Sequence, residues 1–225
     1  MKTEKQSNYR LGLAFLLQFV TSFTAGVLQK SKIVFPGDIP GTFNAVAEYE
    51  TLFRVTLLLD GFTALGVVFL GSVLYRLLKP WGPVAARTGF ALYILEASVH
   101  LTGSAQTYSL LGLARDYFSA QGAETQLVLA VQTLSLMEIS GFIMMLAFCT
   151  GAILFYYLLY KSKIVPVPLS LWGGVSVSLL WIWTVLGILG IQVPFLFYLP
   201  YVPFEFVMAI WFFIKGKQTG KMAVN

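Results

Sequence analysis

Six long apolar segments occupy most of this chain of 225 residues and limit what it can fold into. A membrane-spanning helix needs about 20 predominantly apolar residues, whereas a membrane-spanning strand needs about ten residues of alternating polarity. The segments are longer than such strands and are apolar on nearly every side. We therefore predict an all-α, polytopic membrane protein with a bundle of about six transmembrane helices. The predicted spans cover residues 11–28, 52–78, 84–113, 134–160, 169–193 and 195–214.

The composition leaves little room for anything outside the membrane. Hydrophobic residues make up 57% of the chain and charged residues only 11%. An ordinary soluble domain carries about 25% charged residues. We therefore predict that residues 1–225 form a single transmembrane domain with the lipid bilayer as its main partner. The single Cys149 excludes an intramolecular disulfide and every motif that needs a cysteine pair.

Lysine and arginine lie in short clusters beside the apolar segments, so membrane topology explains the net charge of +5 and we predict no nucleic-acid partner. With the N-terminus inside, eleven of these cations fall on the cytoplasmic side and three fall outside. The positive-inside rule therefore predicts that both termini are cytoplasmic. The eleven are Lys2, Lys5, Arg10, Arg76, Lys79, Arg87, Lys161, Lys163, Lys215, Lys217 and Lys221, and the three are Lys30, Lys32 and Arg115.

Three connections carry further predictions. Two longer ones are expected on the outer side, at residues 29–50 and 116–133. The second includes residues 125–132, which can form either an interfacial helix or an extension of the fourth span. Pro194, Pro200 and Pro203 precede Glu205, and proline removes a backbone donor, so we predict a kinked or broken start to the last span. The alternative is a regular helix with Pro203 in its first turn.

Polar residues within the predicted spans are the strongest functional signal. A charge at the bilayer centre costs about 2.5–3.5 kcal/mol on insertion scales, so such residues usually face the bundle interior or water. The spacing of residues 93, 96, 100, 104 and 107 places a polar stripe along one face of the third span. A polar cavity that opens outward is the expected packing. The candidate ligand-binding or proton-exchange residues are Arg54, Asp60, Tyr93, Glu96, His100, Glu138 and Glu205.

Several of these residues also have a structural interpretation. Arg54 can reach lipid headgroups or pair with a carboxylate from another helix. Glu138 can lie high enough to reach water, and Glu205 can stabilise a helix N-terminus. A lone histidine such as His100 is often a hydrogen-bonded core residue, although its position four residues after Glu96 permits a direct contact.

Charge balance adds a constraint. Four candidate acids face one arginine and at most one charged histidine, so at least two acids lack a cation if all are ionised. A buried carboxylate without a partner takes up a proton or recruits a cation. We therefore expect that some core acid is protonated at neutral pH or that a cation binds, with Asp60 and Glu96 the deepest acids.

Motifs for enzymatic chemistry are scarce. A catalytic zinc site relies strongly on histidine, and this chain has one. A mixed carboxylate and histidine site for a harder metal ion is an open alternative, but we predict neither a metal nor another cofactor. The patterns of serine hydrolases, nucleotide-binding loops and zinc proteases are not present in the sequence.

Several motifs carry a resemblance. They are residues 33–38 (IVFPGD), 50–54 (ETLFR) with Asp60, 74–80 (LYRLLKP), 95–97 (LEA), 158–162 (LLYKS), and Glu205 followed by 209–211 (AIW). Through these, the chain resembles the bacterial membrane family known as domain of unknown function 4386 over nearly its whole length. The resemblance implies a six-helix protein of the bacterial inner membrane. It places Arg54, Asp60, Glu96 and Glu205 within family-like motifs, does not include His100 or Glu138, and implies no activity.

Three hypotheses of function follow. The first is a carrier or receptor-like module whose acid-rich core binds a small cationic or neutral ligand, or exchanges protons. The second is a membrane-embedded enzyme that uses Glu96 and His100 as acid and base on a lipid-like substrate. The third is a structural or regulatory subunit whose buried charges serve the fold alone. The sequence names no protein partner.

Overall fold

The computed structural model describes residues 2–35, 37–119, 124–191 and 193–221. Over this part of the chain it contains α-helices and two short 3₁₀ helices but no strand, which confirms the predicted all-α class. The α-helices are α1 (Lys2–Lys32), α2 (Ile39–Glu48), α3 (Glu50–Leu78), α4 (Pro83–Ser119), α5 (Glu124–Ser162), α6 (Val167–Ile188) and α7 (Val202–Lys221). The 3₁₀ helices are η1 (Lys79–Trp81) and η2 (Phe195–Phe197).

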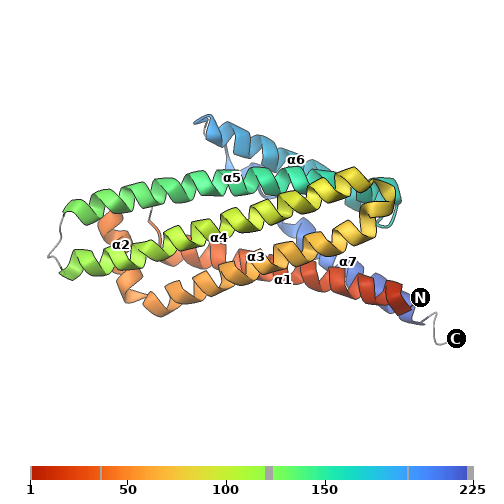
Figure 1. The fold of residues 1–225 in the computed structure, drawn as a ribbon, viewed down its shortest axis with the longest axis horizontal. Helices are drawn as coiled ribbons and strands as arrows, with labels where there is room; N and C mark the ends of the chain where they lie inside the picture. Colours follow the sequence, from red (N-terminus) through yellow and green to blue (C-terminus); the bar gives the residue numbers. More distant parts are fainter. Residues whose placement is uncertain (1, 36, 120–123, 192, 222–225) are drawn as a thin grey trace.

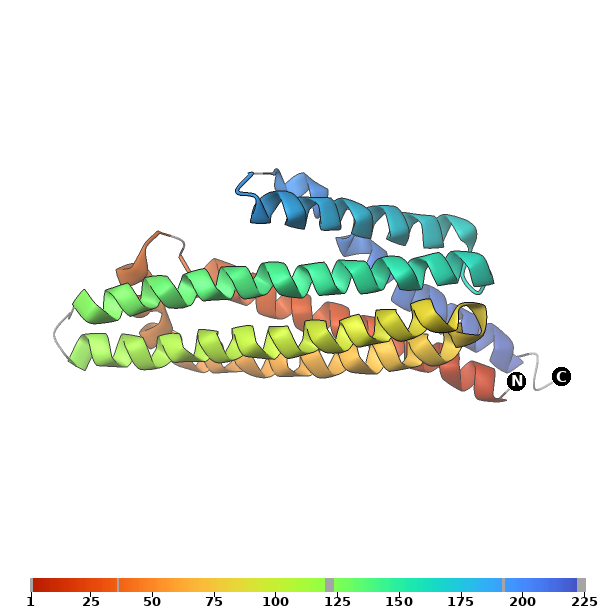
Figure 2. The ribbon, with the colours of Figure 1, turned by 45° about the horizontal axis from the view of Figure 1, so that its top comes forward.

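The long helices lie lengthwise beside one another in an elongated bundle (Figure 1). Helix α4 packs between α3 and α5, α1 packs against α3 and α7, and α6 lies on the outer side of α5 (Figures 1 and 2). The start of α1, the α3–α4 turn, the α5–α6 turn and the end of α7 share one end of the bundle, which we call the terminal end. Helix α2, the end of α4 and the start of α5 lie at the other end, called the α2 end.

Among the described residues, three helices are long and apolar enough to cross a membrane. They are α3 continued through η1 (Glu50–Trp81), α5 and α6. On α3, Leu58, Phe62 and Leu65 are each at least 60% exposed and follow one another along one face, whereas Ala64 and Val67 on the opposite side are buried. A face of large exposed apolar side chains suits contact with lipid tails. These helices support a membrane protein, while the count of six spans stays a prediction.

Close packing of α4 against α5 depends on glycine. A Cβ atom at Gly151 would lie 2.9 Å from Tyr93 Cδ1 and 3.1 Å from the carbonyl oxygen of Gly89, and one at Gly89 would meet Phe155. Small residues of this kind let membrane helices approach closely. The approach fixes the α4–α5 interface and holds the polar residues of α4 against the bundle interior.

The two outer connections contain helix that the predicted spans leave out. Residues 29–50 include α2, whose first turn is capped by Asp38 because its Oδ1 accepts a hydrogen bond of 2.8 Å from the Gly41 amide. Phe43 and Val46 of α2 are fully buried and anchor it to the bundle. Residues 125–132 belong to α5, so of the two alternatives the extension of the fourth span holds.

Helices α6 and α7 differ in their bounds from the fifth and sixth predicted spans. Helix α6 ends at Ile188 instead of residue 193, because Gly190 adopts a left-handed φ of 75° that ends helices. Helix α7 begins at Val202 instead of residue 195, with Pro203 in its first turn. The intervening chain is anchored to α6, where Trp172 Nε1 and Ser176 Oγ donate hydrogen bonds to the Pro200 carbonyl. The last span therefore has a broken start and then a regular proline-initiated helix.

Candidate functional site

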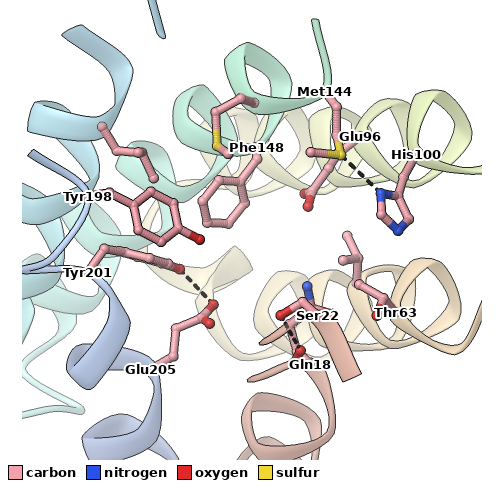
Figure 3. Close-up of a pocket in the computed structure, with 13 residues that line it drawn as sticks. Gln18, Ser22, Thr63, Glu96, His100, Met144, Phe148, Tyr198, Tyr201 and Glu205 are labelled. Atoms are coloured by element: carbon pink, nitrogen blue, oxygen red, sulfur yellow. Dashed lines mark hydrogen bonds between the residues drawn. The ribbon is translucent and has the colours of Figure 1, made fainter. Parts of the chain in front are cut away.

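A cavity of about 110 Å³ lies inside the bundle, and all the long helices contribute to its lining (Figure 3). Glu96 and His100, one turn apart, share the inward face of α4. Glu205 enters from the first turn of α7, which follows the irregular segment after α6. We call this space the Glu96 cavity. Its lining consists of Gln18, Ser22, Thr63, Val67, Glu96, His100, Met144, Met145, Phe148, Leu180, Tyr198, Tyr201 and Glu205.

Unpartnered polar atoms gather around the Glu96 cavity. Glu96 and Gln18 are only 6% and 8% exposed, and Glu96 Oε2 and Gln18 Oε1 have no hydrogen-bond partner among the described residues. The same holds for His100 Nε2. Figure 3 shows the Glu96 carboxylate and the Gln18 side chain directed toward the space between them. Buried polar atoms are normally hydrogen-bonded, so Glu96 Oε2 and Gln18 Oε1 on one cavity point to a polar ligand there, whereas His100 Nε2 faces Asp60.

Tyrosines hold the second carboxylate of the cavity. Glu205 is 8% exposed, and its Oε1 accepts a hydrogen bond of 2.8 Å from the Tyr201 hydroxyl. The Tyr201 hydroxyl lies 3.4 Å from that of Tyr156, which extends the chain of polar groups along α5. Because Glu205 lies in the first turn of α7, the helix dipole also favours its charge there.

His100 stands between the Glu96 cavity and a second cavity of about 180 Å³. Its Nδ1 contacts Met144 Sδ at 3.1 Å, and His100 and Met144 line both cavities. On the other side, His100 Nε2 lies 3.5 Å from Asp60 Oδ1, a distance for charge attraction but too long for a good hydrogen bond. Asp60 Oδ2 accepts a weak hydrogen bond of 3.4 Å from Ser104. We call this second space the Asp60 cavity; Thr107 and Ser140 also line it.

The predicted polar stripe of α4 is divided among three environments. Tyr93 packs in the core, with its ring 5.1 Å from that of Phe155, and does not line the Glu96 cavity. Glu96 lines that cavity, and His100 lies between the two. Ser104 and Thr107 line the Asp60 cavity, which lies nearer the α2 end. The described contacts of His100 are with Asp60 and Met144, and none joins it to Glu96.

Two sequence candidates lie outside both cavities. Arg54 forms an ion pair of 2.8 Å with Glu50, one turn earlier on α3, instead of pairing with a carboxylate of another helix. Arg115 of α4 approaches the same Glu50 oxygen at 2.7 Å, so these three residues form a cluster at the α2 end. Glu138 is exposed on α5 and contributes to neither cavity.

The family model for the domain of unknown function DUF4386 matches residues 11–216. The chain belongs to the DUF4386 family. This match confirms the resemblance found in the sequence and includes every residue of both cavities. No curated protein and no solved structure shows a significant match to the chain.

Sequence reasoning misses part of the site of this DUF4386 protein. Gln18 is the one strongly polar residue between positions 11 and 20 of the first predicted span, a signal that could have been read. Residues 195–198 suggest an interfacial belt or packing, and only the broken start of α7 brings Tyr198 and the nearby Tyr201 to the cavity. Met144 and Phe148 give no signal in a span that is apolar throughout.

Metal binding by the DUF4386 chain finds little support in the donor set. Over the described residues, no group of three or more His, Cys, Asp or Glu side chains is placed to hold a metal ion. The Glu96 cavity offers two carboxylates, one amide, one imidazole and the hydroxyl groups of Ser22, Thr63, Tyr198 and Tyr201, beside aromatic and thioether groups. The arrangement suits a ligand that is part cation and part apolar.

Proposed function

We propose that this DUF4386 protein is an integral membrane protein that binds a small cation, or a proton in its place, in the Glu96 cavity, as a carrier or receptor-like module. One observation carries the proposal: two carboxylates, each more than nine-tenths buried, line one cavity in which acceptor atoms lack partners. Of the described residues that line it, none is Lys or Arg.

The cost of burying charge supports a cation at this position. Two carboxylates in a water-poor bundle repel each other, and their desolvation is not offset by a protein cation other than His100. A ligand cation between Glu96 and Glu205 would supply the missing charge and partners for Glu96 Oε2 and Gln18 Oε1. When that ligand leaves, protonation of one carboxylate would remove one of the two buried negative charges.

The two cavities in series favour a carrier or a gated receptor over an enzyme. The Asp60 cavity lies nearer the α2 end, and only the His100–Met144 contact is shared between the linings of the two cavities. An ion that enters past Asp60 would therefore meet His100 before it reaches Glu96. The hypothesis of Glu96 and His100 as an acid–base pair gains no direct contact from the geometry.

Thermal unfolding of the purified full-length chain in detergent tests the proposal. Melting temperatures are measured across pH and with potassium, sodium, ammonium, magnesium and calcium chlorides at constant ionic strength. We expect the wild type to respond to pH or to at least one cation, and Glu96→Gln and Glu205→Gln to lose that response. Glu138→Gln is the matched control, because Glu138 is an acid of α5 outside both cavities. A wild type that responds to nothing, or a control that loses the response equally, contradicts the proposal.

A further inference from the structure

We infer that the ligand of the Glu96 cavity is a small, partly methylated ammonium ion, an inference that rests on the proposed function and names its ligand class. The lining combines two kinds of surface. Acceptor atoms come from Glu96, Gln18 and Glu205, while Phe148, Tyr198 and Tyr201 supply aromatic rings. Figure 3 shows the three rings gathered on the side of the cavity away from His100 and Thr63.

The acceptors require a ligand with N–H groups. Glu96 Oε2 and Gln18 Oε1 are buried without partners, and both belong to residues more than nine-tenths buried. No group of three or more His, Cys, Asp or Glu side chains among the described residues is placed to hold a metal ion, and a neutral ligand would leave two carboxylates without a counter-charge. An ammonium ion with at least one N–H satisfies an acceptor and supplies the positive charge at the same time.

The rings require a ligand with apolar, cationic surface. Phe148 and Tyr201 meet edge to face with ring centroids 5.5 Å apart, so they form a corner. Aromatic faces attract methylated ammonium groups through their quadrupole, and methionine sulfur is a soft, polarizable neighbour for methyl groups. Met145 also lines the cavity, and Met144 lines it beside His100. Inorganic ions gain little here because they would have to exchange hydration water for carbon and sulfur.

The volume limits the size of the ion. The cavity has about 110 Å³, whereas a cavity of roughly 150 Å³ lined by apolar side chains admits benzene. A ligand on the order of five non-hydrogen atoms therefore fits. This range includes methylammonium, dimethylammonium and trimethylammonium, and it excludes polyamines, amino acids with large side chains, and lipid headgroups with their glycerol.

The test is a titration series on the purified full-length protein in detergent. Ammonium, methylammonium, dimethylammonium, trimethylammonium and tetramethylammonium chlorides are compared with potassium chloride at equal ionic strength, and Kd values come from tryptophan fluorescence and melting temperatures. We expect dimethylammonium or trimethylammonium to bind at least fivefold more tightly than ammonium or potassium. Tetramethylammonium should bind more weakly than trimethylammonium, because it has no N–H for Gln18 and Glu96.

Two variants separate the two surfaces. Phe148→Leu should weaken the methylated ions about fivefold and ammonium less than twofold, whereas Phe62→Leu, at a 60% exposed position on α3, should change neither. Gln18→Leu should weaken trimethylammonium but leave tetramethylammonium unchanged. If a variant does not fold, the titration series on the wild-type protein still tests the inference. Equal or tighter binding of potassium or ammonium overturns this inference but keeps the proposed function, and a lack of response to every cation and to pH overturns both.

Discussion

Two clusters in this bundle are built around glutamate carboxylates but in opposite ways. At the α2 end, the Glu50 carboxylate is held by Arg54 and Arg115 at 2.8 and 2.7 Å, and all three side chains are at least one-third exposed. In the Glu96 cavity, Glu96 and Glu205 are more than nine-tenths buried and no described Lys or Arg lines the space. The exposed acid, Glu50, which water can solvate, pairs with two arginines. The buried acids Glu96 and Glu205 have no Lys or Arg among the described residues of their cavity.

The contrast indicates different roles for the two clusters. An exposed ion pair contributes little because water already solvates both charges, whereas a buried unpaired charge costs several kcal/mol. A chain that needed its buried acids only for structure would be more stable with apolar residues in their place. The Glu50 cluster therefore connects helices, and the Glu96 cavity is expected to respond to ligands and protons.

The largest expected effect is the loss of ligand-linked stability in the cavity. A cation that binds only the folded state at a concentration of 100 Kd stabilises it by about 2.7 kcal/mol. We expect this increment in the wild type and its absence in Glu96→Gln and Glu205→Gln, measured as the difference in melting temperature with and without dimethylammonium chloride. Glu50→Gln is the comparison, because it removes an acid from the other cluster and should keep the whole increment.

A smaller effect is expected at the tyrosine that holds Glu205. Tyr201→Phe removes the 2.8 Å hydrogen bond to Glu205 Oε1 and leaves a buried acceptor without a partner. We expect a loss of about 1–2 kcal/mol in the free energy of unfolding without ligand. Tyr157→Phe is the control, because Tyr157 is 56% exposed. Equal stability of both variants would show that the bond does not hold Glu205 in place.

The third prediction separates the two cavities. Asp60 faces His100 from the Asp60 cavity and does not line the Glu96 cavity. Asp60→Asn should therefore keep a cation response, with binding weakened by no more than about 1 kcal/mol through the lost long-range attraction. Titrations of dimethylammonium against Asp60→Asn and Glu96→Gln measure the difference. If Asp60→Asn abolishes the response as fully as Glu96→Gln does, the two cavities form one site.

The sequence predicts the all-α fold class and the polar face of α4, but not the whole of the Glu50 cluster. Long apolar runs specify helices regardless of how those helices pack, so the all-α class follows directly. The i, i+4 spacing also puts Glu96 and His100 on one face of α4. The i, i+4 spacing of Glu50 and Arg54 is typical of an ion pair within a helix, but nothing in the sequence indicates that Arg115 of α4 approaches the same carboxylate.

Other parts of the site depend on turns that leave a weak trace in the sequence. The left-handed Gly190 ends α6 early, and the chain then returns through Pro200 to set Tyr201 beside Glu205. Hydropathy treats residues 195–214 as one span because the irregular segment is as apolar as the helix that follows. A cavity forms where helices fail to fill space, which is a property of the packed bundle and not of any one segment.

The smallest expected effect belongs to the Glu50 cluster. Glu50→Gln should lower the free energy of unfolding by about 1 kcal/mol or less, because exposed ion pairs gain little over their hydrated ions. Of its two partners, Arg115 should matter more, since it joins α4 to α3, whereas Arg54 pairs within α3 itself. We therefore expect Arg115→Gln to lower the melting temperature more than Arg54→Gln, and high salt to reduce both differences by screening.

The cavity response to dimethylammonium should persist at that salt, because buried pairs are screened much less. The assigned roles would be wrong if Glu50→Gln lost more stability than dimethylammonium adds to the wild type. They would also be wrong if the stability lost in Glu50→Gln did not depend on salt.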